Sequence, residues 1–319
     1  MTLHKIVIPT SFPIGPVNVY LVEGDPLTLI DTGPRTDEAL QTLEQGVAAL
    51  GYALGDIRRI IITHTHPDHF GLVRQLVERS GASIWTHPFN ADWFNNLALA
   101  VQRRGEFTLQ LFKQSGVPDA LIDMMRQMSP VMGQFFEEAP TDHWLDDGDT
   151  LEMDGALWQT VFTPGHAGGH IALYQPQTQQ MVVGDHLLKY ISSNPLIEAP
   201  HAPGLPRAKA LVQYLDSLKK VAALDVAVAY PGHGDNINDH RLLIAERISF
   251  HEQRAERIAA LLDQGERTAY QLVQEMFPRL ADFDIFLGLS EVIGHLDILQ
   301  LQGRVIEAPR NGHLVYASQ

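Results

Sequence analysis

The chain has 319 residues, of which 45% are hydrophobic and 19% charged; its formal net charge is −15 and it has no cysteine. This composition fits a folded protein with a sizeable core rather than a disordered chain, and the negative charge argues against a general nucleic-acid binder, which usually carries a basic surface. Without cysteine there can be no disulfide or thiolate metal site, so any metal must be held by nitrogen and oxygen.

Targeting signals are not evident in the sequence. No apolar run approaches the roughly 18 residues that a membrane span needs. Residues 1–10 lack the basic stretch and the long apolar stretch of a signal peptide. We therefore expect a cytoplasmic protein that does not associate with membranes.

The first part of the chain alternates short β-branched apolar runs with helical stretches, which is typical of a mixed α/β domain. Gly24-Asp25 indicates a hairpin, Thr36 can cap a helix that Gly51 ends, and Pro67 can open another helix. The expected elements are strands at 5–9, 17–23 and 27–31, a helix at 36–50, a strand at 59–63, a helix at 70–80 and a strand at 83–86.

Residues 90–138 are helical in period and rich in Met and Phe. Such a stretch is either ordinary helical core or an adaptable apolar cover over a site, because Met surfaces adapt to ligands. We favour the core interpretation, because apolar stripes are mostly core. Strands resume at 157–162, 171–174, 181–183 and 226–230, with a helix at 207–223 between the last two.

The character of the chain changes after about residue 240. Helices are expected at about 240–263, 269–277 and 283–302, followed by a hairpin of 305–308 and 313–317. This is the order of a winged helix, so we expect a catalytic domain at 1–238, with a helical insert at about 90–138, and a winged-helix-like domain at 239–319.

The third expected helix of this tail is acidic. It carries Asp284, Glu291 and Asp297 and no Lys or Arg before Arg304, whereas contact with phosphate in a groove needs cations. We therefore interpret the tail as a packing or dimerisation module, expect a homodimer, and expect a small-molecule substrate rather than strong nucleic-acid binding.

His or Asp side chains directly follow the ends of four expected strands. In three of these places a glycine precedes the His or Asp and allows a sharp turn, and chemistry is often mounted on loops at strand ends. The seven residues are His64, His66, Asp68, His69, His166, Asp185 and His233.

The spacing of the four candidate residues from His64 to His69 allows them to face two neighbouring points. His64 and His66 project to one side of an extended backbone, whereas Asp68 and His69 follow Pro67 at a helix start and can face a second point. Four candidate ligands in six residues suit two metal ions better than one, and imidazole with carboxylate suits zinc first, and also iron or manganese. A polar helix-capping turn would explain Asp68 but not three histidines.

Asp185, as the third such strand end, is expected to be a bridging carboxylate. A lone histidine is more often an ordinary hydrogen-bonded residue than a ligand, and the remaining single histidines receive that interpretation. They are His4, His87, His143, His201, His240, His251, His295 and His313.

These motifs, in this order, resemble the metallo-β-lactamase superfamily over about residues 1–237. The resemblance implies an αββα sandwich with the site along one edge. It implies that His64, His66 and His166 hold one metal, that Asp68, His69 and His233 hold the second, and that Asp185 bridges them. Asp31, in Asp31-Thr32-Gly33, would support the ligands from behind.

Further motifs resemble particular branches of that superfamily. Gly184-Asp185-His186, residues 191–195 and the tail resemble the β-lactamase-like protein 2 branch, whose best-known member is described as a ribonuclease. Residues 163–169 are also similar to glyoxalase II and to acyl-homoserine lactonases. Those lactonases place a tyrosine three residues after the bridging aspartate, where this chain has Leu188.

We therefore expect a dinuclear metallohydrolase that acts on a small ester, thioester or lactone. Two metal ions lower the pKa of a shared water, and Asp68 is the expected catalytic residue that orients this water and takes its proton. The residues expected to contact substrate are His170, Lys189, Tyr190 and Asn194. The alternatives are an endoribonuclease or phosphodiesterase of the β-lactamase-like protein 2 type and an iron-dependent oxidoreductase on the same scaffold. A non-catalytic binder is disfavoured because no ligand is missing.

Overall fold

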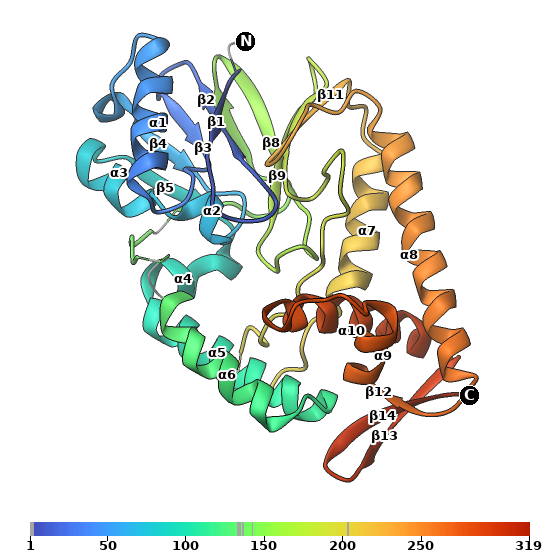
Figure 1. The fold of residues 1–319 in the computed structure, drawn as a ribbon. Helices are drawn as coiled ribbons and strands as arrows, with labels where there is room; N and C mark the ends of the chain where they lie inside the picture. Colours follow the sequence, from blue (N-terminus) through green and yellow to red (C-terminus); the bar gives the residue numbers. More distant parts are fainter. Residues whose placement is uncertain (1–2, 133–134, 136, 142, 203) are drawn as a thin grey trace.

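The computed structural model describes residues 3–132, 135, 137–141, 143–202 and 204–319. Two β-sheets face each other, and helices cover their outer faces (Figure 1). The first sheet has the order β1 (Leu3–Ile8), β2 (Val17–Val22), β3 (Thr28–Ile30), β4 (Arg59–Ile61), β5 (Ser83–Thr86), β6 (His143–Trp144). Strands β1 to β3 pair antiparallel, and β3 to β6 pair parallel.

The second sheet has the order β11 (Val228–Pro231), β10 (Gln180–Gly184), β9 (Ile171–Gln175), β8 (Ala156–Phe162), β7 (Thr150–Met153). Its pairs are antiparallel except β10 with β11. The carboxyl ends of β8, β10 and β11 therefore lie toward one edge of this sheet, as the carboxyl end of β4 does in the first.

The alternation of side chains along each strand explains the layers. Ile61 of β4 packs between the sheets with Trp158 and Val182, whereas its neighbours Ile60 and Ile62 pack against the outer helices. The outer helices of the first sheet are α1 (Asp37–Ala49) and α3 (Val73–Ser80), and those of the second are α7 (Ala210–Ala222) and α8 (His240–Leu262).

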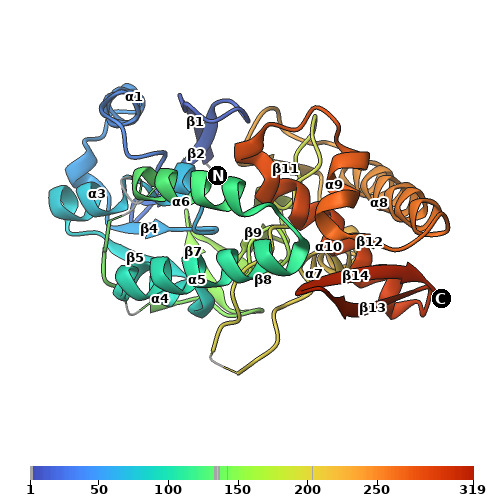
Figure 2. The same cartoon turned by 60° about the horizontal axis from the view of Figure 1, so that its bottom comes forward.

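The insert forms α4 (Ala91–Asn95), α5 (Leu97–Ser115) and α6 (Asp119–Met132). It lies beside the C-terminal elements (Figure 2), which are β12 (Arg267–Thr268), α9 (Ala269–Met276), α10 (Ile285–Leu301), β13 (Val305–Arg310) and β14 (His313–Ser318). Leu111 and Phe112 of the insert belong to the same hydrophobic cluster as Leu289 and Val292 of α10. Residues 133, 134 and 136 of the expected insert lie outside the described residues.

The mixed α/β architecture is confirmed, with two local corrections. The single helix expected at 70–80 is wrong: α2 (Pro67–Phe70) ends before Gly71, and α3 starts at Val73. A Cβ at Gly71 would lie 2.5 Å from the Arg35 nitrogen, so the chain breaks where the backbone of a neighbouring loop packs closely. The short strands β6, β7 and β12 were not expected from the sequence.

The expectations about the tail, the localisation and the oligomer are only partly addressed by the fold. The helix–helix–helix–hairpin order of the tail is observed, but the winged-helix interpretation and the division at residue 238 stay predictions. No described helix is both long and apolar enough to cross a membrane. Cytoplasmic residence and homodimer formation stay predictions.

Candidate metal centre

The seven ligand-type side chains meet at the edge where strands of both sheets end. Four follow β4 of the first sheet, and the others follow β8, β10 and β11 of the second. Six of them are buried and His66 is half-buried. The centre thus joins the two sheets, and its residues are His64, His66, Asp68, His69, His166, Asp185 and His233.

These side chains fall into two groups around two points. In the first group, His66 Nδ1 lies 3.0 Å from His64 Nε2 and 2.9 Å from His166 Nε2. In the second group, formed by Asp68, His69 and His233, His233 Nε2 lies 3.3 Å from Asp68 Oδ2.

Asp185 stands between the two groups. Its Oδ2 lies 3.7 Å from His166 Nε2 and 3.6 Å from His233 Nε2, and its Oδ1 lies 3.4 Å from His69 Nε2. The carboxylate therefore faces both points, which is the position that a bridging ligand would take.

Hydrogen bonds on the outer side fix how the histidines face the centre. The Nδ1 atoms of His69, His166 and His233 lie 2.8, 3.0 and 2.8 Å from Asp31 Oδ2, the Asn194 carbonyl and the Pro16 carbonyl, respectively. A carbonyl or carboxylate oxygen can only accept, so each Nδ1 carries the hydrogen and donates it. Each Nε2 therefore faces inward and, once free of a proton, presents the lone pair that a metal ligand needs.

Asp31 holds the first cluster from behind. Its carboxylate accepts from the Thr63 backbone N–H at 2.8 Å, from the Thr63 hydroxyl at 2.8 Å and from His69 Nδ1. Its backbone has φ +59°, a strained conformation for a residue other than glycine. These contacts place Asp31 behind His69, and its role as a support for a metal ligand stays a prediction.

The residues present fit a pair of divalent cations. Three buried atoms that face the centre have no hydrogen-bond partner among the described residues: His69 Nε2, Asp185 Oδ1 and His233 Nε2. Such buried orphan atoms are costly unless something satisfies them. At Gly232 a Cβ would lie 2.2 Å from Asp185 Oδ1, so only glycine leaves room for this carboxylate. The donor set of nitrogen and oxygen suits zinc, iron or manganese.

The charges of these side chains also favour the binding of divalent cations. Burial and the neighbouring histidines hold the pKa of His64 well below the usual range, so its lone pair is available. Burial alone would raise the pKa of Asp185, but His69 and His233 lower it by more than burial raises it, so this carboxylate is ionised. Burial lowers the pKa of His69, yet Asp185 and Asp31 outweigh it and raise that pKa well above the usual value. The negative charges of Asp185 and Asp31, which favour a proton on His69, would equally attract a metal cation.

The expected substrate residues are placed elsewhere. His170 is buried behind His64, with Nδ1 2.8 Å from the Thr163 hydroxyl. Lys189 pairs with Asp235 at 3.6 Å, and the exposed Tyr190 donates its hydroxyl to the same carboxylate. Asn194 contributes its backbone carbonyl to His166. None of the four lines the cavity described next, and their contact with substrate stays a prediction.

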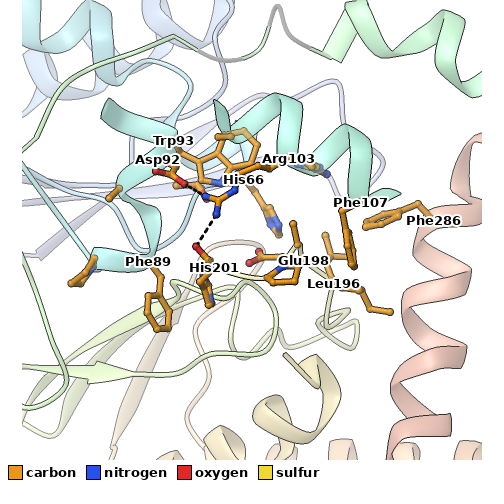
Figure 3. A pocket seen from close by; sticks show the side chains of 18 residues that line it. His66, Phe89, Asp92, Trp93, Arg103, Phe107, Leu196, Glu198, His201 and Phe286 are labelled. Carbon is orange, nitrogen blue, oxygen red and sulfur yellow. Dashed lines mark hydrogen bonds and ion pairs between the residues drawn. The ribbon is translucent and has the colours of Figure 1, made fainter. Parts of the chain in front are cut away.

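A cavity of about 220 Å³ lies beside His66 (Figure 3). Its walls come from α4 and α5 of the insert, the loop after β5, residues 196–201 and Phe286 of α10. Trp93 and Phe107 line it, whereas Leu111 and Phe112 are core. The core interpretation of the insert was therefore incomplete, because part of the insert also covers the site.

Sequence reasoning also missed residues that position the candidate ligands. Asn18 Nδ2 and the Tyr20 hydroxyl, both from β2, donate to the Pro231 carbonyl at 2.9 and 2.6 Å and so hold the turn before His233. The Ser193 hydroxyl lies 2.8 Å from His166 Nδ1. No local signal marks these residues, because Asn18 and Tyr20 lie more than two hundred residues from the turn that they hold.

A separate histidine-containing group lies in the C-terminal part, where His251, Glu291 and His295 are buried together. Here the ring nitrogens have partners: His251 Nδ1 lies 3.3 Å from His295 Nε2, and His295 Nδ1 donates to the Glu291 carbonyl at 2.6 Å. Arg254 already pairs with the Glu291 carboxylate at 2.6 Å. The ordinary interpretation of both histidines therefore fits this group.

The chain is similar in sequence and in structure to known proteins. A family model described as "Metallo-beta-lactamase superfamily" matches residues 13–233. The chain is 35% identical to "Probable metallo-hydrolase YqjP" of Bacillus subtilis, over 99% of this chain and 98% of the relative. A solved metallo-beta-lactamase family protein from Thermus thermophilus is 30% identical, with a TM-score of 0.82 over 99% of this chain and 98% of that protein.

Two more distant relatives carry different functional names. The "Beta-lactamase-like protein 2 homolog" of Caenorhabditis elegans is 24% identical over 81% of this chain and 69% of the relative. "Thioesterase pkgB" of Emericella nidulans is 26% identical over 80% of this chain and 56% of the relative.

Proposed function

The chain belongs to the metallo-β-lactamase superfamily, and we propose that it is a hydrolase that uses two divalent cations, zinc at both positions, on a small ester, thioester or lactone. One observation carries the proposal. Inward-facing ring nitrogens and two carboxylates converge on two neighbouring points, with Asp185 facing both.

In this proposal each residue has a defined task. His64, His66 and His166 would hold one cation, Asp68, His69 and His233 the other, and Asp185 would contact both. When bound, the cations supply a water of lowered pKa and polarise the substrate carbonyl. Asp31, Ser193 and the Asn194 carbonyl keep the imidazoles in their orientation through the outer hydrogen bonds.

Asp68 is the proposed catalytic residue. Burial raises its pKa, but His69 and His233 lower it more, so the carboxylate is ionised and can accept a proton. Asp68 orients the attacking water and removes one proton from it. The water oxygen forms a bond to the acyl carbon, the bond from that carbon to the leaving sulfur or oxygen breaks, and the proton passes to the leaving atom.

Two observations support an acyl substrate. The cavity beside His66 has the size of a small acyl group rather than of a polymer, and the likeness to the Emericella nidulans thioesterase points to the same bond type. A nucleic-acid substrate has less support, because most residues of α10 are buried and cannot enter a groove. No observation favours an iron-dependent oxidoreductase over hydrolysis.

The test combines metal analysis with a substrate panel of thioesters, esters, lactones, phosphodiesters and β-lactams. We expect two metal ions per chain and turnover of an acyl substrate without consumption of oxygen. His66→Ala should lose the first metal and reduce turnover to background, whereas the exposed His313→Gln should match the wild type. Undiminished turnover in a His66→Ala protein that has lost metal would refute the proposal.

A further inference from the structure

The cavity beside His66 has both a charged and an apolar side (Figure 3). Asp92, Trp93, Arg103 and Phe107 reach into it from the insert, Glu198 and His201 face them from residues 196–201, and Phe286 closes one end. Arg104 is a further lining residue.

Arg104 is a cation without a close partner. No hydrogen bond or ion pair joins its guanidinium to any residue in the described part of the chain, and the guanidinium carbon lies 5.8 Å from the centre of the Trp93 ring. Arg103, the preceding residue, differs: it donates to Asp92 at 2.6 Å and to the His201 carbonyl at 3.2 Å. Two adjacent arginines thus line one cavity, but only Arg103 has its charge neutralised by contact.

Glu198, the second carboxylate that lines the cavity, makes no hydrogen bond or ion pair with Arg104 in the described part of the chain. Glu198 packs on Gly168, where a Cβ would lie 2.5 Å from Glu198 Oε2, and it acts on Arg104 only from a distance. Burial lowers the pKa of Arg104 and raises that of Glu198, and their mutual attraction offsets each shift only in part. A guanidinium nevertheless stays charged at any ordinary pH and gains much from a carboxylate that meets its planar fork.

Much of the remaining lining is apolar, although Thr65, His66 and His201 also contribute. Phe89, Trp93, Phe107, Leu196 and Phe286 contribute rings or aliphatic groups, and Phe89 stacks on His201 with centroids 3.9 Å apart. Aromatic and aliphatic walls with one unsatisfied polar group are typical of a site that binds an apolar ligand in a fixed orientation.

We propose that this cavity binds the acyl group of the substrate, and that this group is apolar or aromatic with one carboxylate that Arg104 binds. The scissile carbonyl would then lie at the centre beside His66. A single unpaired cation suits one negative charge rather than the two of a phosphate. The inference rests on the proposed function for the reaction itself, but the binding of the carboxylate can be measured without turnover.

The kinetic test uses 4-nitrophenyl half-esters of dicarboxylic acids with about four to eight carbons, a range that a cavity of this size can hold. Each is compared with its neutral monoamide, which differs only in charge. The wild type should prefer the acid of the best length, mainly through a lower KM, and Arg104→Gln should reduce that preference by about ten- to a hundredfold. Arg104→Lys should retain part of it, and the exposed Arg126→Gln, which removes the same charge from α6, should retain all of it.

A second measurement separates this proposal from the proposed function. Calorimetry on metal-free protein would compare the free dicarboxylate with its diamide, in the wild type and in Arg104→Gln. Binding of the acid that Arg104→Gln abolishes supports the cavity assignment even if no ester is hydrolysed, in which case only the proposed function fails. Equal handling of acid and amide by the wild type, or an unchanged preference in a folded Arg104→Gln, overturns the assignment.

Discussion

Replacing Gly232 by alanine should disable the centre without removing any ligand atom. The new Cβ would lie 2.2 Å from Asp185 Oδ1 and 2.7 Å from the Cε1 atom of His69, both shorter than Cβ contacts found in proteins. The backbone of Gly232 cannot easily retreat, because its N–H donates to the Gly184 carbonyl at 2.8 Å and its carbonyl accepts from the Asn18 N–H at 2.6 Å. The Asp185 carboxylate must therefore move.

The size of the effect follows from that displacement. Reaching even 3.0 Å requires a movement of at least 0.8 Å, and a misplacement of about 1 Å in an active site can reduce activity about a hundredfold. This corresponds to about 2.7 kcal/mol of transition-state stabilisation. We expect kcat/KM on the best acyl substrate to fall by about that factor, with weaker retention of at least one metal ion.

The assay measures kcat/KM, metal content per chain and thermal unfolding on the same preparations. Gly55→Ala is the matched control, because its Cβ would meet only the Arg79 carbonyl oxygen at an ordinary 3.7 Å; this variant should behave as the wild type. Wild-type metal content and activity in Gly232→Ala would show that Asp185 does not occupy a bridging position.

Two further predictions concern groups around and away from the centre. Asp31→Asn should weaken metal affinity about ten- to a hundredfold, measured by chelator competition, because it removes the anionic acceptor of His69 Nδ1; unchanged affinity would contradict this role. Burial lowers the pKa of His251 from 6.5 to about 4, so between these pH values the unfolded chain binds a proton that the folded chain refuses. Acidification should therefore cost up to about 3 kcal/mol of unfolding free energy, and urea unfolding of metal-free His251→Gln should lack that part of the pH dependence, whereas His313→Gln should keep it.

Much of the convergence of these seven side chains could be predicted from the sequence, because each candidate ligand comes within a few residues of the end of an apolar strand. Residues 59–63 and the cluster from His64 to His69 lie in one continuous stretch, so their local pattern alone indicates where side chains can converge. The strands at 181–183 and 226–230 end in Gly184-Asp185 and Gly232-His233. Since parallel strands end at one edge of a sheet, the pairing of β10 with β11 brings Asp185 and His233 together.

The cavity could not be predicted in the same way. Arg104, Glu198 and Phe286 lie far apart in the chain and belong to a helix, an irregular segment and another helix. Nothing local distinguishes Arg104 from Arg103, because only the folded structure shows which guanidinium has a partner. Likewise the break at Gly71 depends on the close approach of residues 34 and 35, which no helical period encodes.

The tail and the insert together form the outer wall of the cavity beside His66. Leu111, Phe112 and Ile122 of the insert share a hydrophobic cluster with α8, α9 and α10, and Phe286, near the start of α10, lines the cavity beside His66. A helix buried in this way cannot read a groove, but through Phe286 it limits the length of the cavity. Under the proposed function, the strand-end side chains would carry out the reaction, and selectivity between acyl groups would arise where the insert and the tail meet at this cavity. The same packing explains how acidic residues are tolerated in α10: Asp297 is buried but pairs with Arg207 through two hydrogen bonds of 2.7 and 2.8 Å, which ties the tail to the segment that leads into α7.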